Sequence, residues 1–346
     1  MNTRHLLYCR PGFERDCAEE ALRHSPRAEV LDATENSGYV RLQGPSRLDY
    51  ATLIFARQVI RELGSVEALP ERDRLTPILA ALPDAPQRFG ALWLETPDTN
   101  DGKELSSFTR RFGPLLETAL QAAGRLEAND KLPRLHLFFP DRQRVVLGTS
   151  EPGKSADGLM GILRQKMPPE APSRSTLKLS EAFGVFLGSE EIRLLKPGMT
   201  AVDLGAAPGG WTWQLIRRGI RVQAVDNGPL KGAVLGHPLV EHLRVDGFRH
   251  RPRRPVDWLV CDMVERPQRV AALMADWLIH GHARHTVFNL KLPMKKRVDT
   301  VYTALADLRA TLDDAGLRYR LSAKQLYHDR EEITVYVGRV AEGRKR

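Results

Sequence analysis

The sequence is poor in cysteine and has no long hydrophobic run. Its 346 residues include three cysteines, Cys9, Cys17 and Cys261, which show no metal-ligand spacing and cannot all pair with one another. We therefore expect no metal site and a reducing compartment, the cytoplasm. Nowhere do about 18 apolar residues follow one another, as a membrane-spanning helix would need. Residues 1–25 carry charges throughout, so we expect neither a signal peptide nor membrane contact.

The dinucleotide fingerprint GxGxxG is also absent, but another glycine-rich stretch is present. Residues 201–214 read AVDLGAAPGGWTWQ, which predicts a short strand, a tight loop and a helix. Small side chains let the loop backbone approach a ligand, and the start of the helix offers unpaired N–H groups to an anionic group. We therefore expect a nucleotide-like ligand, held by Ala206, Ala207, Pro208, Gly209 and Gly210.

Basic residues outnumber acidic ones, with 52 Lys and Arg against 43 Asp and Glu, a net charge of +9. This balance suits a polyanionic partner such as nucleic acid. The length is sufficient for two domains. Five basic residues of the first half could form an RNA-facing surface, although a solvated face is the alternative: Arg110, Arg111, Arg142, Arg144 and Lys154.

The first 150 residues predict two small α+β regions. Strand, helix, strand, strand over residues 1–50 indicates a ferredoxin-like unit. Residues 51–150 alternate strands and helices, end in a hairpin across Pro140 and Asp141, and resemble a THUMP-type RNA-binding domain. Residues 151–172 are rich in glycine and proline and predict a linker, with a short helical run at residues 159–166.

Residues 173–346 alternate strand and helix, beginning with a helix expected at residues 180–194. This alternation predicts a Rossmann-like α/β domain with a mostly parallel, doubly wound sheet, whose ligands lie at the carboxyl ends of the strands. Asp226 and Asp246 end the second and third strands. An acid at such a place can accept hydrogen bonds from ribose hydroxyls or an adenine amino group, although either could merely cap its loop.

Four ionisable residues lie beside apolar segments of this half: Lys178, Asp262, Lys291 and Glu332. Taken singly, each could have a surface or salt-bridge role. Base methylation at carbon 5 of cytosine needs a cysteine nucleophile and is disfavoured, since Cys261 lies within an apolar strand. Methylation of an exocyclic amine usually needs an Asp or Asn, Pro, Pro, aromatic box after the fourth strand. It is disfavoured because that segment reads DMVERP. The neighbouring Glu331 is the alternative to Glu332, which directly precedes the apolar strand.

The strings APSRSTLKLSEAFGVFL, DLGAAPGGWTWQL, VDNGPL, DMVERP, NLKLPMKKR and LYHDREEITVYV resemble the bacterial 23S ribosomal RNA (cytidine-2′-O)-methyltransferase M family. The resemblance implies transfer of a methyl group from S-adenosyl-L-methionine to the ribose of a cytidine in the peptidyl-transferase region, before full ribosome assembly. It also implies a Lys178, Asp262, Lys291, Glu332 tetrad. The cofactor contacts that it implies are Ser173, residues 206–210, Asp226, Asp246 and Asp262. We expect a monomer.

In such a tetrad, Lys291 is our candidate proton acceptor for the ribose 2′-hydroxyl. We expect a second cation and partial burial to lower its pKa, so that a neutral amine is available. Asp262 and Lys178 would orient the lysine and the ribose, and Glu332 would hold Lys178. Two other functions remain open: an RNA-binding ribosome assembly factor on an inactive methyltransferase fold, and a nicotinamide-dependent oxidoreductase.

Overall fold

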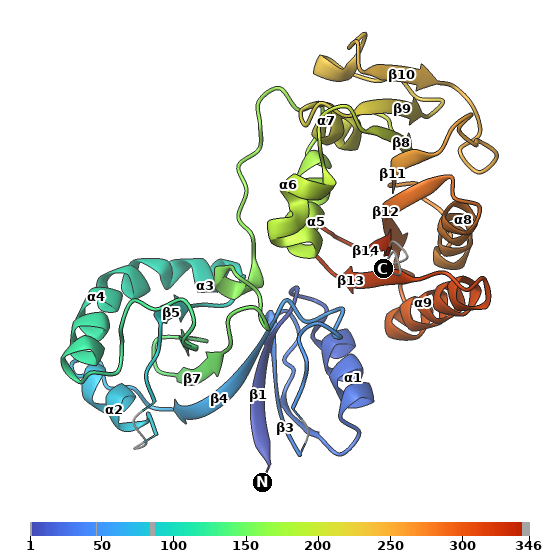
Figure 1. The fold of residues 1–346 in the computed structure, drawn as a ribbon. Coiled ribbons are helices and arrows are strands. Elements are labelled where there is room, and N and C mark those ends of the chain that lie inside the picture. The colour runs from blue at the N-terminus through green and yellow to red at the C-terminus, as the bar shows by residue number, and fades with distance from the viewer. Residues whose placement is uncertain (1, 46, 84–86, 341–346) are drawn as a thin grey trace, which may run out of the picture. The chain divides into compact units, whose positions relative to one another are not determined.

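Two seven-stranded sheets organise the computed structural model, which describes residues 2–45, 47–83 and 87–340. One sheet lies in the unit formed by residues 1–162 and the other in the unit formed by residues 163–346 (Figure 1). The boundary between these units falls inside the stretch 151–172 expected to be a linker. The finer division at residues 50 and 150 stays a prediction.

The first sheet has the strand order β2-β3-β1-β4-β7-β6-β5 and is antiparallel except for the β5–β6 pair. Its core lies where Phe112, Leu116 and Leu120 of α4 are buried with Leu135 and Leu147 of the sheet. The elements of this unit are β1 (Thr3–Tyr8), α1 (Glu14–His24), β2 (Glu29–Asp32), β3 (Tyr39–Gly44), β4 (Gln58–Val66), α2 (Leu75–Ala80), β5 (Ala91–Glu95), α3 (Asn100–Glu104), α4 (Ser106–Ala122), β6 (Arg134–Phe138), β7 (Val145–Ser150) and η1 (Leu159–Gly161).

The second sheet has the order β10-β9-β8-β11-β12-β14-β13. The five neighbouring strands β10, β9, β8, β11 and β12 are parallel, whereas β14 runs antiparallel to both of its neighbours. Its elements are α5 (Thr176–Leu187), η2 (Gly188–Glu190), α6 (Glu191–Leu194), β8 (Thr200–Leu204), α7 (Gly210–Ile216), β9 (Arg221–Val225), η3 (Gly232–Val234), β10 (Val240–Leu243), β11 (Val256–Cys261), α8 (Pro267–Ile279), β12 (Ala283–Lys291), α9 (Arg297–Asp314), β13 (Tyr319–Lys324) and β14 (Glu332–Arg339). The chain order reverses at β8, so the sheet has a switch point there, where open α/β sheets bind ligands.

Two expected helices differ from the structure. The helix expected at residues 180–194 begins earlier, at Thr176, and is interrupted. Helix α5 ends at Leu187, just before Gly188, whose φ of 51° is left-handed, and only a 3-10 turn and the short α6 follow. The helical run expected at residues 159–166 was wrong beyond η1, a single 3-10 turn in which Met160 has φ 59°. Left-handed residues end a regular helix, and apolar spacing does not reveal them.

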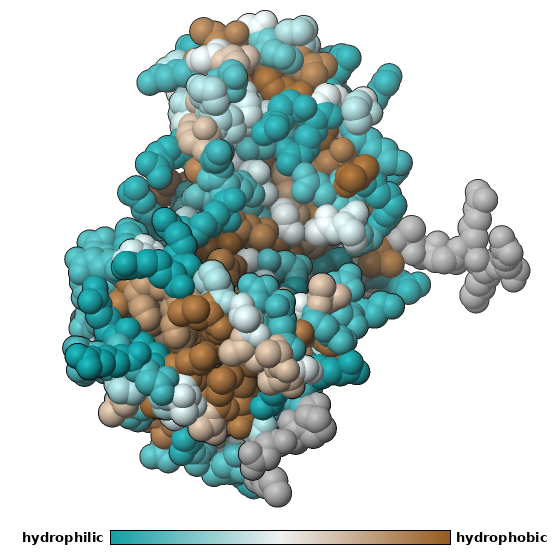
Figure 2. Space-filling model, turned by 90° about the vertical axis from the view of Figure 1, so that its left-hand side faces the viewer, coloured by the Kyte–Doolittle hydropathy of each residue, from teal (hydrophilic) through white to brown (hydrophobic). Residues whose placement is uncertain are grey.

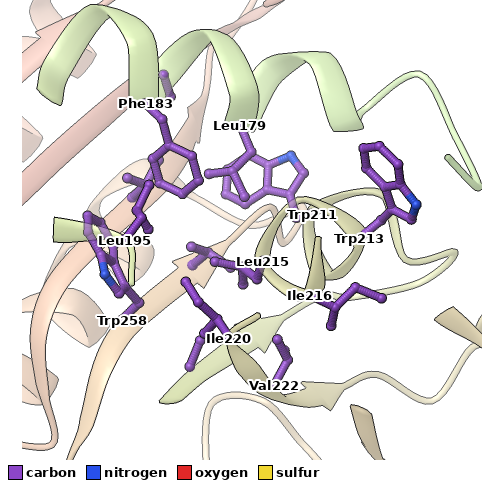
Figure 3. Close-up of a cluster of buried hydrophobic side chains, with 14 of the residues drawn as sticks. Leu179, Phe183, Leu195, Trp211, Trp213, Leu215, Ile216, Ile220, Val222 and Trp258 are labelled. Carbon is purple, nitrogen blue, oxygen red and sulfur yellow. The ribbon is translucent and has the colours of Figure 1, made fainter. Parts of the chain in front are cut away.

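A hydrophobic cluster fixes α5 and α7 against the second sheet. Figure 3 shows Leu179 and Phe183 of α5 beside Trp211 and Leu215 of α7, with Trp258 of β11 in the same buried cluster. The two α5 side chains are four residues apart and so share one face of the helix. This packing determines the position of Lys178, which directly precedes Leu179.

Hydrophilic residues cover most of the face shown in Figure 2, and hydrophobic residues gather in one area of the N-terminal unit. In that unit, Leu115 on α4 is among the large hydrophobic residues that remain exposed. Across residues 2–45, 47–83 and 87–340, none of the helices combines the length and the apolar character that crossing a membrane requires.

Candidate active site

The four tetrad residues lie at one edge of the second sheet, the carboxyl end of its parallel strands. Asp262 directly follows β11, and Lys291 is the last residue of β12. Because β14 runs in the opposite direction, its first residue, Glu332, reaches the same edge and lies opposite Lys291 in the strand register. Lys178 comes from the first turn of α5. The fold thus brings together residues that are up to 154 positions apart, from 178 to 332.

The two lysines and the two carboxylates form an alternating ring. Lys291 Nζ donates to Asp262 Oδ1 at 2.5 Å and also to Glu332 Oε2. Lys178 Nζ pairs with the other oxygen of Glu332, Oε1, and lies 3.6 Å from the other oxygen of Asp262, Oδ2. Each carboxylate therefore offers one oxygen to each lysine, and the charges of the ring balance.

Hydrogen bonds outside the ring hold α5 and β14 in place. Glu181, one turn after Lys178 on α5, accepts bonds from the backbone N–H groups of Tyr327 and His328, both at 2.9 Å. These two residues belong to the loop that leads into β14. Glu331 points elsewhere, since its side chain is 61% exposed and pairs with Arg297 at 2.9 Å. Glu332 is thus the member of the pair that enters the ring.

The charge state of Lys291 differs from our expectation. Partial burial lowers its pKa, but the charges and hydrogen bonds of Asp262 and Glu332 outweigh that effect and raise the pKa above its usual value of 10.5. The expectation of a lowered pKa was therefore wrong for this state of the protein. Lys178, the other cation of the ring, binds the same two carboxylates.

Sequence reasoning missed a polar layer beneath the ring. Asn289 of β12 donates from its amide to Asp262 Oδ1 at 3.0 Å and to Glu332 Oε2 at 3.4 Å. Its amide oxygen lies 2.9 Å from the hydroxyl of Thr334, which in turn contacts the carboxyl group of Asp329. Asn289, Thr334 and Asp329 are fully buried. The one available signal was an amide within an otherwise apolar strand, VFNLK.

The glycine-rich loop between β8 and α7 lies at the same edge of the sheet. Gly209 has a φ of 116°, which side chains rarely permit. A Cβ on Gly210 would lie 2.2 Å from Ser175 Oγ, 2.5 Å from Ser173 Oγ and 2.9 Å from the backbone nitrogen of Thr176, so a larger residue would displace both serine hydroxyls. Ser173 Oγ itself lies 2.7 Å from Ser175 Oγ. Ser173 is thus placed against the loop, which also contains Ala206, Ala207 and Pro208.

The loop and its surroundings fit a nucleoside-bearing cofactor. Asp203 on β8 is fully buried, and Thr212 of α7 donates to its Oδ2 at 2.6 Å. Its Oδ1 has no hydrogen-bond partner among the described residues, and burial raises its pKa to about 7. A buried acid with a spare acceptor, beside a loop restricted to small residues, suits a ligand with amino and hydroxyl groups.

The two acids expected at the strand ends organise their own loops. Asp226, after β9, accepts from the backbone N–H of Ala207 at 2.9 Å and of Gly228 at 2.7 Å. Asp246 is exposed, accepts from Phe248 N at 2.8 Å and pairs with Arg249 at 3.6 Å. Asp226 therefore lies against the glycine-rich loop, whereas Asp246 caps the turn that follows β10. Their roles as cofactor contacts stay predictions.

The five basic residues proposed for RNA contact differ in their local partners. Arg144 donates to Asp141 at 2.7 Å, Lys154 pairs with Glu151 at 2.9 Å, and Arg111 donates to a backbone oxygen of its own helix. Arg110 and Arg142 are exposed and have no ion pair within residues 2–45, 47–83 and 87–340. These two guanidinium groups are the ones most available to a phosphate.

Comparison with known proteins gives matches along the whole chain. Three family models match: RlmM ferredoxin-like domain at residues 2–60, Ribosomal RNA large subunit methyltransferase M, N-terminal, at residues 73–151, and FtsJ-like methyltransferase at residues 171–299. Two relatives are called Ribosomal RNA large subunit methyltransferase M. The one from Laribacter hongkongensis is 56% identical over 100% of both chains. The one from Methylococcus capsulatus is 51% identical over 96% of this chain and 97% of its own.

These matches confirm the expected fold class. The FtsJ-like model matches residues 171–299, which include strands β8 to β12 of the doubly wound sheet, and the ferredoxin-like model covers the first strands of the other unit. The THUMP-type character of residues 51–150 stays a prediction.

Proposed function

Because the chain belongs to the ribosomal RNA large subunit methyltransferase M family, we propose that it methylates the ribose 2′-oxygen of a cytidine in 23S ribosomal RNA, using S-adenosyl-L-methionine. The observation that carries the proposal is the ring of Lys178, Asp262, Lys291 and Glu332 beside a glycine-rich loop. Ribose methylation needs a proton acceptor for a weakly acidic hydroxyl, and this ring contains no better candidate than Lys291.

The cofactor would be held by the loop of residues 206–210, Ser173 and Asp226, with Asp246 and Asp262 at the border of its site. When bound, it supplies a methyl group on a positively charged sulfonium. Asp262 and Glu332 hold Lys291 from two sides, which fixes the direction of its Nζ. Lys291, once neutral, would accept the proton of the ribose hydroxyl, whose oxygen would take the methyl group as that group's bond to the sulfonium sulfur breaks.

Lys178 has a different task from Lys291. It shares both carboxylates with Lys291, and we assign it the role of orienting the ribose, as the resemblance implies. A fixed array of charges at the edge of the sheet needs little rearrangement during the reaction. Because the pKa of Lys291 is raised, its neutral form is scarce near neutral pH and becomes more abundant as the pH rises. We therefore expect methyl transfer to accelerate with pH.

The finer features of the substrate belong to the same proposal. We place the target in the peptidyl-transferase region, as the resemblance implies. The substrate is RNA that has not completed assembly, because the ribose must be accessible to the tetrad and would be buried in the assembled ribosome. The protein acts as a monomer in the cytoplasm. Residues 1–50 and 51–150 serve as RNA-binding regions, joined through residues 151–172 to the methyltransferase domain at 173–346.

Exchange of Lys291 for alanine tests the proposal against an RNA-binding assembly factor. We expect Lys291→Ala to lower kcat by about 10²- to 10⁴-fold, the usual contribution of a general base, with binding of S-adenosyl-L-methionine and RNA within twofold of the wild type. Single-turnover transfer of labelled methyl groups, calorimetry and RNA binding would be measured on the same preparations. Unchanged methyl transfer would contradict the assignment of Lys291. A wild-type protein that binds RNA and transfers no methyl group would favour the assembly factor.

A further inference from the structure

The polar layer beneath the tetrad follows the strand register. On β12 and β14, Lys291 lies opposite Glu332, Asn289 opposite Thr334, and Val287 opposite Tyr336. Because side chains two positions apart share a face, these three pairs form successive rungs on one face of the sheet. The outer rung belongs to the tetrad, and the inner rung belongs to the hydrophobic cluster of Figure 3. Asn289 and Thr334 form the rung between them.

The hydrogen bonds determine which way the Asn289 amide faces. Asp262 Oδ1 and Glu332 Oε2 only accept, so the amide nitrogen must lie toward them. The amide oxygen then faces Thr334 Oγ1 at 2.9 Å and requires its single hydrogen. Asp329 contacts that same Oγ1 at 3.0 and 2.9 Å. Since the hydroxyl hydrogen is already used, a satisfied network places a proton on Asp329, which donates to Thr334.

The surroundings of Asp329 agree with this direction. Its Oδ2 accepts from Leu326 N at 2.9 Å. Burial first, and then the negative charge of Glu332, raise the pKa of Asp329 well above its usual value. A protonated Asp329 therefore begins a chain of hydrogen bonds that runs through Thr334 and Asn289 to the two carboxylates of the ring.

Burying such a polar layer in the core of a sheet costs free energy. Apolar residues could fill the rung between the tetrad and the hydrophobic cluster, and a buried polar group is tolerated only when its hydrogen bonds are complete. Here the Asn289 amide reaches the same two oxygens that bind Lys291, Asp262 Oδ1 and Glu332 Oε2. The amide is thus placed to act on the ring rather than to support the strands, which already pair through their backbones.

We propose that Asn289 is a positioning residue for methyl transfer, which holds Asp262 and Glu332 at the separation that lets them share Lys291, with Thr334 and Asp329 fixing its orientation. This inference rests on the proposed function of the tetrad. Asn289 touches neither substrate nor cofactor in this assignment and acts through Lys291.

The layer also affects proton transfer. Hydrogen bonds from Asn289 stabilise the negative charge of the two carboxylates and weaken their hold on the ammonium form of Lys291. Without those bonds, the carboxylates attract the ammonium more strongly, and the pH at which Lys291 becomes neutral rises. The ionisable groups that act on this layer are those of the ring together with four neighbours: Lys178, Lys291, Asp262, Glu332, Asp329, Glu181, Asp203 and Cys261.

The test compares three variants with the wild type: Asn289→Leu, which keeps the volume and removes both donors, Thr334→Val, which removes the orienting hydroxyl, and their double variant. For Asn289→Leu we expect kcat to fall about 10- to 100-fold and the acid limb of its pH profile to move up by about half to one pH unit, with cofactor affinity within twofold. Thr334→Val should show a smaller change in the same direction. The double variant should equal Asn289→Leu, since Thr334 acts through Asn289.

Thr286→Val is the matched control. Thr286 is a buried threonine of the same strand, and its hydroxyl contacts Met274 on the opposite face. We expect its kcat and pH profile to match the wild type. Additive losses, or an unshifted pH profile in Asn289→Leu, would overturn the inference. NMR titration of ¹³C-labelled lysine side chains reports the Lys291 pKa without turnover. If Asn289→Leu raises that pKa but the wild type transfers no methyl group, the proposed function is refuted while the effect of Asn289 on Lys291 stands.

Discussion

Exchange of Glu332 for glutamine should move the pH dependence of methyl transfer downward. Glu332 is one of the two carboxylates that raise the pKa of Lys291. A unit charge at about 4 Å contributes about 4 kcal/mol at an effective dielectric constant of 20, or roughly three pKa units. The Lys291 side chain is 23% exposed, and Asp262 stays in place at 2.5 Å, so we expect about one to two units after screening.

The sign follows from the protonation state that the reaction needs. A lower pKa gives more neutral Lys291 at a given pH, so the acid limb of kcat moves to lower pH in Glu332→Gln. The limiting kcat should fall, because Lys178 loses a partner. A pKa lower by about one to two units should raise the fraction of neutral Lys291 at pH 7 by about 10- to 100-fold, which offsets the fall in limiting kcat there. Only the variant should bend toward a plateau at a pH where the wild-type rate still rises.

The assay measures initial rates of labelled methyl transfer to an RNA transcript between pH 6.5 and 10.5, at saturating cofactor and with incubations short enough to keep the transcript intact. Asp203, whose pKa is about 7, titrates in both proteins and contributes to both profiles. Glu332 also raises the pKa of Asp329 and pairs with Lys178, so NMR titration of ¹³C-labelled lysine side chains identifies the group whose pKa has moved. Thermal unfolding at each pH shows whether both proteins stay folded. Parallel profiles, or an acid limb that moves upward in Glu332→Gln, would refute the assignment of Lys291 as the proton acceptor.

Three further changes test the cofactor loop and the RNA surface. Asp226→Asn should weaken cofactor binding about tenfold or more in calorimetry, because a charged acceptor beside the loop is lost; an unchanged Kd would contradict this. Gly210→Ala should weaken cofactor binding, since its Cβ would displace the Ser173 and Ser175 hydroxyls and lie 2.9 Å from the backbone nitrogen of Thr176, whereas Gly113→Ala, with its nearest contact at 3.7 Å, should bind normally. The double exchange of Arg110 and Arg142 for glutamine should weaken RNA binding and reduce the salt slope by about 1.4 to 1.8, and an unaltered slope would place RNA elsewhere.

The local sequence predicted the elements of the site well. The glycine-rich loop after β8 and the acids after β9 and β11 follow from strands that end in polar or small residues. The order of Lys178, Asp262, Lys291 and Glu332 along the chain indicated a shared site only through resemblance. Their contacts depend on the antiparallel β14, which places residue 332 opposite residue 291. Nothing in the local pattern fixes that register.

The pKa of Lys291, the role of Asn289 and the break after α5 could not be predicted from the sequence, because each depends on contacts or backbone conformation in the folded protein. The pKa of Lys291 depends on how many carboxylates meet its Nζ, and residues from β11 and β14 meet there. Asn289 looked like an irregularity of an apolar strand until its partners across the sheet were known. The break after α5 depends on the left-handed Gly188, which apolar spacing does not reveal.

The most direct test of the function is nucleoside mass spectrometry on unmodified 23S ribosomal RNA incubated with the purified protein and labelled S-adenosyl-L-methionine. We predict label in 2′-O-methylcytidine with the wild type and none with Lys291→Ala. Label in a base-methylated nucleoside would contradict the account, because the tetrad would then not act on a ribose hydroxyl.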